Sequence, residues 1–292
     1  METPLARPAV TPETKAEAAG LGARSLTDTL LLGLAVLAAY FGLWNAYFTQ
    51  DDFWMLGWVR HRSGLLDAML AQLGYGVRFL LDANLWLRVQ VLGLEPAGYY
   101  WISLLQHFGI VLLVYGLARA WTGRRWVALL AGLLFATTPT HFEVVTWITG
   151  SNYSLAALPY LGALFGLTLY RAGRSVAWYW LSVALCLAAL LVAEVALSLP
   201  LTLLVYDGLM GRGRRPWREW RWTDLVAHAP YWLLLGGYLG LQVLNLHAGS
   251  SEAAVAREAF RPGLHILTNL VNLAYLPLPP YALSALLPWL GA

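Results

Sequence analysis

Long apolar runs recur along almost the whole chain, and they constrain its fold more than any other feature. The hydrocarbon core of a bilayer is about 30 Å thick, so a helix that crosses it needs about 20 mainly apolar residues. Runs of about this length lie near residues 30–48, 98–119, 125–140, 152–170, 176–193, 195–210, 225–246 and 264–290. We therefore expect an all-α polytopic membrane protein with about eight transmembrane helices.

The composition supports this reading. Hydrophobic residues make up 59% of the chain and charged residues only 12%, whereas soluble domains carry about 25% charged residues. This balance excludes a disordered chain, a collagen-like chain and an ordinary cytosolic enzyme. The single cysteine, Cys186, excludes an intrachain disulfide and a cysteine-based metal site. The net charge of +3 comes from basic residues at the ends of apolar runs, which form no stripe for nucleic acid.

The distribution of basic residues predicts the orientation. If the N-terminus lies in the cytoplasm, 13 of the 19 Lys and Arg residues fall on the cytoplasmic side, as the positive-inside rule requires. Residues 1–27 then form a disordered cytoplasmic tail, and 28–292 form the transmembrane domain. The strong excess of Arg over Lys, with abundant Ala, Leu and Gly, suggests a GC-rich bacterial genome and hence a bacterial inner membrane.

One long outer segment, residues 49–97, follows the first apolar run. Aromatic and leucine residues alternate there with polar ones, and glycines at 64, 74 and 76 interrupt the pattern. Amphipathic segments of this kind lie in the interface plane with the apolar face toward the lipid. We expect this segment to form an amphipathic platform, in contact with membrane lipid, on the outer face.

Acidic residues from three separate hairpins are expected at this same outer face. Asp51 and Asp52 follow the first run, Glu143 follows the third, and Glu194 interrupts the stretch between the fifth and sixth. Ionisable groups at membrane depth are costly and usually face a cavity, so each is a candidate site residue. His141, two positions before Glu143, joins this set. A metal site at this pair is disfavoured, because a spacing of two does not share a helical face.

Four candidate residues also have a structural alternative. Asp51 could cap a short helix, and Glu194 could mark a turn at the interface. His141 could donate to a backbone carbonyl. Arg78, in the outer platform, could extend toward the interface or bind a phosphate, for which its planar fork is suited.

Three stretches carry a resemblance to a known family. They are VRFLLDANLWLRVQVLGLEPAGYYWISLLQHFGIVLLVYGLARAWTG, FATTPTHFEVVTWITGSNYSLAALPYLGALFGLTLY and LAALLVAEVALSLPLTLLVYDGLM. With the acidic pair before the platform, they resemble the polytopic GT-C glycosyltransferases. The resemblance is to the branch of protein O-mannosyltransferases with tetratricopeptide repeats and their bacterial relatives. It covers residues 28–290 as a pattern. The family usually has Lys-Glu at the last of these turns, and here Ala193 replaces the lysine.

The resemblance implies an inverting transferase that uses a polyprenyl-phosphate-linked sugar as its donor. Asp51 or Asp52 would be the catalytic base for an acceptor hydroxyl on a protein or glycan. His141, Glu143 and Glu194 would line the cavity and orient the substrates. Arg78 would neutralise the leaving phosphate. No cofactor is implied with certainty, and a divalent cation is left open.

Full members of the family have more spans and often a C-terminal domain, so the chain is expected to be short at the C-terminus. A non-catalytic or degenerate membrane subunit on the same scaffold is therefore an alternative function. A component that binds or transports lipid-linked sugars is another. Transporters place their polar groups near the midplane, whereas the acids here cluster at one face.

Overall fold

The computed structural model describes residues 12–43, 46–49, 51–70, 73, 76–210 and 225–248. Its helices are α1 (Pro12–Ala39), α2 (Asp52–Arg60), α3 (Leu65–Leu70), α4 (Phe79–Leu92), α5 (Pro96–Thr122), α6 (Arg125–Thr137), η2 (Pro139–His141), α7 (Phe142–Thr146), η3 (Thr149–Ser151), α8 (Asn152–Arg171), α9 (Ala177–Val192), η4 (Glu194–Ser198), α10 (Leu199–Met210) and α12 (Ala229–Ala248). These residues contain no strand, so the all-α prediction is confirmed for them.

The number of membrane crossings differs from the prediction. Two segments of the described chain, α5 and Thr149–Arg171, are long and apolar enough to cross a membrane. A third crossing arises if α6 and Pro139–Thr146 act together, although they meet at an angle of 51°. The structure therefore supports two or three crossings and does not support eight. The expected run at 264–290 lies outside the described residues.

The short length of several helices explains part of this difference. Thr138 is extended and Pro139 follows it, so α6 ends after 13 residues. Ala193 is also extended, with φ −158° and ψ 150°, and this ends α9 after 16 residues. Both helices are shorter than the roughly 20 residues that a crossing needs.

Local signals set both ends of the longest apolar helix, α5. Pro96 occupies its first turn, where the missing N–H of proline costs nothing. Gly123 follows its last residue with φ 68°, and its N–H donates to the Arg119 carbonyl over 3.0 Å. That left-handed conformation favours glycine. These signals fix the position of α5, the helix that follows the expected platform.

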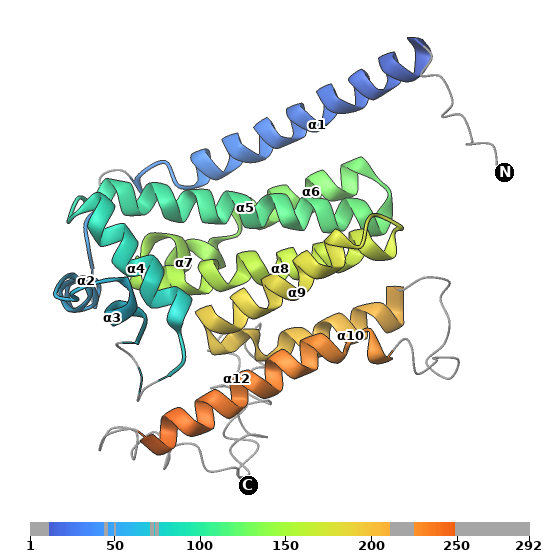
Figure 1. Ribbon diagram of the computed structural model, residues 1–292. Helices are drawn as coiled ribbons and strands as arrows, with labels where there is room; N and C mark the ends of the chain where they lie inside the picture. Colours follow the sequence, from blue (N-terminus) through green and yellow to red (C-terminus); the bar gives the residue numbers. More distant parts are fainter. Residues whose placement is uncertain are drawn as a thin grey trace, which may run out of the picture.

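The helices pack as a bundle of elongated hairpins (Figure 1). Helix α5 packs along α6 and α8, α8 packs along α9, and α1 lies against α5 and α6. One group of buried apolar residues joins α1, α2, α4 and α5, and a second joins α8, α9, α10 and α12. Figure 1 shows α2, α3, α4 and α7 gathered at one end of the bundle and the α5–α6 and α8–α9 turns at the other.

Ion pairs with a buried acidic partner hold the end that carries those two turns. Asp28 of α1 is 1% exposed and pairs with Arg125 of α6 at 2.6 Å. Asp207 of α10 is bound by Arg171 of α8 and by His228, which precedes α12. These contacts tie consecutive hairpins together far from the expected site.

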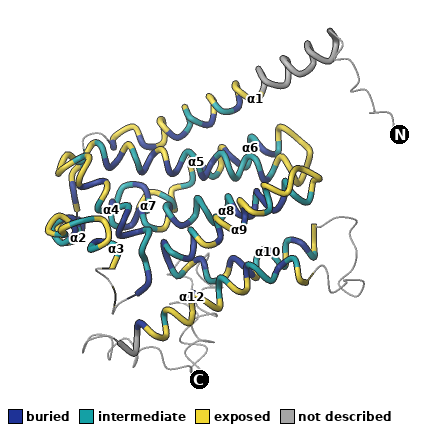
Figure 2. Tube along the Cα trace, in the orientation of Figure 1, coloured by how far each residue is buried: buried dark blue, intermediate teal, exposed yellow. Residues whose placement is uncertain are grey.

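The outward faces of the bundle are strongly apolar. Figure 2 shows exposed residues along α1, α6 and α10, and large apolar side chains supply many of them. Leu34 is 63% exposed, Trp126 61% and Leu209 63%. Soluble proteins rarely expose apolar surface of this extent, so these faces indicate a membrane protein.

The expected N-terminal tail and the expected platform both contain helices in the described residues. Helix α1 begins at Pro12, inside the tail expected over residues 1–27, and residues 1–11 lie outside the described part. The expected platform at 49–97 contains α2, α3 and α4. Helix α2 buries Leu56 and Val59 and leaves the apolar side chains of Phe53 and Trp54 exposed. The domain boundaries themselves stay a prediction.

Candidate functional site

The exposed carboxylate of Asp51 stands at the start of α2. Asp51 is the residue before the first helical turn, yet its side chain makes no capping bond to the helix. Its Oδ1 instead accepts a hydrogen bond of 2.8 Å from the indole Nε1 of Trp147. The two residues are 96 positions apart, so the bond fixes the start of α2 against the turn after α7. The Asp51 residue is exposed, and its Oδ2 accepts no hydrogen bond from the described residues.

The neighbouring carboxylate of Asp52 has the opposite environment. Asp52 is fully buried, and its Oδ1 accepts bonds of 2.7 Å from both the N–H and the hydroxyl of Thr149. Its Oδ2 accepts a bond of 3.1 Å from the N–H of Thr49. Three donors therefore satisfy this buried charge, as buried charges require. Of these two adjacent acids, Asp51 is accessible, whereas Asp52 binds α2 to the turn at 147–149.

Arg78 and Glu194 form a second polar group at the same end of the bundle. The Nε of Arg78 donates to both carboxylate oxygens of Glu194, at 3.0 and 3.1 Å. Gly76 makes this approach possible, because a Cβ on it would lie 3.1 Å from Oε1 of Glu194. Tyr238 of α12 donates to the Val77 carbonyl over 3.3 Å. The ion pair therefore lies where the start of α4, the start of η4 and α12 meet.

His141 and Glu143 are not part of either group. His141 donates from Nδ1 to the Phe135 carbonyl over 3.0 Å, and its ring lies 4.2 Å from the Phe135 ring. This is the backbone contact named as its structural alternative. Glu143 is exposed, and its side chain makes no hydrogen bond or ion pair within the described residues. In those residues, no three His, Cys, Asp or Glu side chains group as a metal site would.

Two charged residues of α4 were missed by the sequence reasoning. Asp82 is fully buried, and burial raises the pKa of its carboxyl to about 7. Arg88 is 4% exposed and donates to the Ser151 hydroxyl over 3.3 Å. Burial lowers the pKa of Arg88 to about 10. The sequence does show these two charges within an apolar stretch. The prediction of an amphipathic platform at 49–97 placed them on its polar face, so they were not counted as buried.

The structure thus places the six predicted residues in separate environments. Asp51 and Asp52 join the turn at 147–149, and Arg88 reaches the end of the same turn at Ser151. Arg78 and Glu194 form their own pair. No hydrogen bond joins these two groups within the described residues. The sequence placed all the acids in one cavity, and whether they share a substrate stays a prediction.

Comparisons with known proteins agree with the resemblance. The chain is 32% identical over 193 residues to Protein O-mannosyl-transferase Tmtc1 of Drosophila melanogaster, covering 66% of this chain and 20% of the relative. It is 25% identical over 167 residues to Protein O-mannosyl-transferase TMTC3 of Mus musculus, covering 56% of this chain and 17% of the relative. The chain therefore spans about a fifth of the length of these relatives.

No family model and no solved structure matches the chain. The two similarities suggest the O-mannosyltransferase branch of glycosyltransferases as the class of protein. Together with the apolar outer faces, they suggest a membrane protein.

Proposed function

We propose that this chain is a membrane glycosyltransferase that moves a mannosyl unit from a polyprenyl phosphate to an acceptor hydroxyl, with Asp51 as the catalytic base. The observation that carries the proposal is the position of Asp51. Its carboxylate is exposed at the start of α2 and is held by Trp147 of the turn after α7. The names of the two relatives support transfer of mannose to protein.

The proposed reaction needs no nucleotide, because the lipid phosphate is the leaving group. The acceptor oxygen attacks the anomeric carbon from the face opposite the phosphate, and its proton passes to Oδ2 of Asp51. The new bond joins this oxygen to the anomeric carbon, while the bond from that carbon to the phosphate oxygen breaks. The polyprenyl phosphate leaves as an anion, and the anomeric configuration inverts. A base in this role must lie within hydrogen-bond reach of the hydroxyl.

The other residues take supporting roles in the proposal. Asp52 is a positioning residue, because its three hydrogen bonds fix the backbone that carries Asp51. Arg78 retains its terminal amino groups for the leaving phosphate, with Glu194 orienting its guanidinium through Nε. Cationic groups of this kind stabilise charge that develops in a transition state. His141 and Glu143 would contact the sugar or the acceptor.

The proposal includes a place in the cell. We place the N-terminus in the cytoplasm and the end with α2, α3 and α4 on the outer side of a bacterial inner membrane. The charge distribution supports this orientation, because Arg119, Arg124, Arg171 and Arg174 all lie at or beside the turns of the opposite end (Figure 1).

The test is transfer of labelled mannose from polyprenyl-phosphate mannose by the full chain in membranes. Asp51→Asn should abolish transfer, because the amide cannot accept the proton, while its oxygen still accepts the Trp147 bond. Asp67→Asn is the matched control, since Asp67 lies in the same platform and, among the residues that the structure describes, binds the nearby Ser63 and Arg62. Full activity of the Asp51→Asn protein would exclude Asp51 as the base.

A second measurement separates transfer from binding. Native mass spectrometry of the purified chain would show whether it retains polyprenyl-phosphate mannose. Retention by the wild-type chain with no transfer to any acceptor would contradict the enzyme and support the non-catalytic binding subunit.

A further inference from the structure

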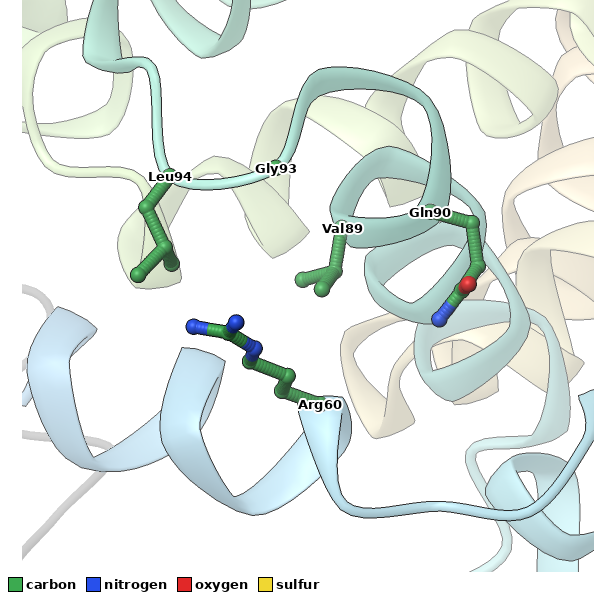
Figure 3. A pocket seen from close by; sticks show the side chains of 5 residues that line it. All are labelled: Arg60, Val89, Gln90, Gly93 and Leu94. Atoms are coloured by element: carbon green, nitrogen blue, oxygen red, sulfur yellow. The ribbon is translucent and has the colours of Figure 1, made fainter.

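Two adjoining cavities lie between α2 and the junction of α4 with α5. One has a volume of about 500 Å³ and is lined by Arg60, Val89, Gln90, Gly93 and Leu94 (Figure 3). The other has a volume of about 360 Å³ and includes Phe48, Phe53, Leu56 and Gly57. Arg60 and Leu94 line both. We call the combined space the α2–α4 groove. Each volume lies within the range of about 300–1,000 Å³ typical of ligand pockets.

The groove carries a positive charge without a matching negative one. Figure 3 shows the Arg60 side chain extending toward the loop at Gly93 and Leu94. Its guanidinium makes no hydrogen bond or ion pair with the described residues, and no acidic residue is among those that line the two cavities. His61 adds a further nitrogen at the same end. An anion bound in the groove would therefore neutralise the charge of Arg60.

The rest of the lining is apolar and follows one face of α2. Phe53, Leu56, Gly57 and Arg60 have the i, i+3, i+4, i+7 spacing of a single helical face. The ring of Phe53 lies 6.1 Å from that of Phe48. An occupant that complements both parts of the groove has an anionic head against Arg60 and a hydrocarbon portion against these aromatic rings.

The neighbouring face of α2 indicates the depth of the groove in a membrane. Trp54 is 65% exposed and stacks on Trp58 with the ring centroids 6.1 Å apart. Exposed tryptophans are enriched at the level of lipid headgroups. The groove therefore opens where phospholipid headgroups are present at high concentration.

The position of Arg60 separates this anion from the donor phosphate of the proposed reaction. Asp51 and Arg60 are nine positions apart at opposite ends of α2, which corresponds to about 13 Å along the axis. The phosphorus of a sugar phosphate is only two bonds from the carbon that is attacked. The proposed reaction assigns the donor phosphate to Arg78, so Arg60 at the far end of α2 is left for a different anion.

We propose that the α2–α4 groove binds one membrane phospholipid with an anionic headgroup, its phosphate against Arg60 and its acyl chain along Phe53 and Leu56. The test of this proposal measures the lipid that the chain retains. Its outcome therefore does not depend on whether the chain transfers sugar. The bound lipid would hold α2, and with it Asp51, at a constant depth in the membrane.

The test is native mass spectrometry of the full chain after exchange from nanodiscs that contain phosphatidylglycerol and phosphatidylcholine. The wild-type chain should retain one phosphatidylglycerol. Arg60→Gln should lower this retention about tenfold, because it removes a charge-assisted bond to phosphate. Arg60→Lys should restore part of it. The matched control is Arg174→Gln, which removes an exposed arginine at the other end of the bundle.

A second variant fills the groove and leaves its charge intact. A Cβ on Gly57 would meet no atom within 4 Å outside its own stretch of helix, and Gly57 lines the second cavity, so Gly57→Leu places a side chain in the groove. Leucine is also the better helix former, so the variant should fold. It should lose the phosphatidylglycerol, while Gly236→Leu, at an exposed and equally open helical glycine of α12, should keep it.

Retention at the wild-type level in both Arg60→Gln and Gly57→Leu would overturn the proposal. Displacement of the lipid by millimolar inorganic phosphate would also overturn it, since it would show a simple anion site. Displacement by an equal concentration of polyprenyl phosphate would assign the groove to the donor lipid instead.

Discussion

Replacement of Asp52 by asparagine separates its structural role from the chemical role proposed for Asp51. In the Asp52→Asn protein, the amide oxygen can still accept from the N–H and the hydroxyl of Thr149. It does so without a negative charge, and hydrogen bonds to charged groups are roughly twice as strong as neutral ones. The amide nitrogen then faces the N–H of Thr49, so two buried donors oppose each other.

The magnitude follows from these three contacts. Loss of charge on the two Thr149 bonds, which are 2.7 Å long, and an unsatisfied N–H at Thr49 together cost about 2–4 kcal/mol. For a chain of this size, each kcal/mol lowers the Tm by about 2–4 °C. Asp52→Asn should therefore lower the apparent Tm by roughly 5–15 °C. Asp51→Asn keeps its exposed bond to Trp147 and should change the free energy of unfolding by less than about 0.5 kcal/mol.

The measurement is thermal unfolding of the purified variants in one detergent at one scan rate, since membrane proteins often unfold irreversibly. We expect the Tm of the Asp52→Asn protein to fall well below that of the Asp51→Asn protein. A Tm for Asp52→Asn within about 1 °C of the wild type would refute the structural assignment. An equal loss in Asp51→Asn would refute the distinction between the two acids.

Three further predictions concern other parts of the structure. Burial raises the pKa of Asp82 to about 7, above the value of about 3.9 in an unfolded chain. Between these values the folded state binds the extra proton, so stability should fall as pH rises from about 4 to 7. Asp82→Asn should flatten this dependence of the apparent Tm. Arg78→Gln should cost less than about 1 kcal/mol of stability, because its pair with Glu194 is over one-third exposed, yet should weaken retention of polyprenyl phosphate in native mass spectrometry. Gly166→Ala should cost about 1–3 kcal/mol in thermal unfolding, since its Cβ would lie 3.0 Å from the Trp178 carbonyl oxygen at the α8–α9 contact.

Features written locally in the sequence were predictable. Apolar runs gave the positions of most helices, since a helix satisfies its own backbone and needs only an apolar face to pack. Pro96 and Gly123 marked the limits of α5. The break before Glu194 was also visible, because a carboxylate interrupts an apolar run there. The eight expected crossings are not supported in the described residues, because α6 and α9 end after 13 and 16 residues, fewer than the roughly 20 that a crossing needs.

The contacts of the candidate site were decided by the tertiary structure. Asp52 and Thr149 are 97 positions apart, and Arg78 and Glu194 are 116 apart. Their meeting depends on how α4, α7 and α9 pack, and no local pattern encodes it. The sequence showed that acids gather at one end of the bundle, because each follows or interrupts an apolar run. Only the packing decided that Asp52 is buried and satisfied while Asp51 is exposed, since the start of α2 presents one side to the turn at 147–149 and the other to the surroundings.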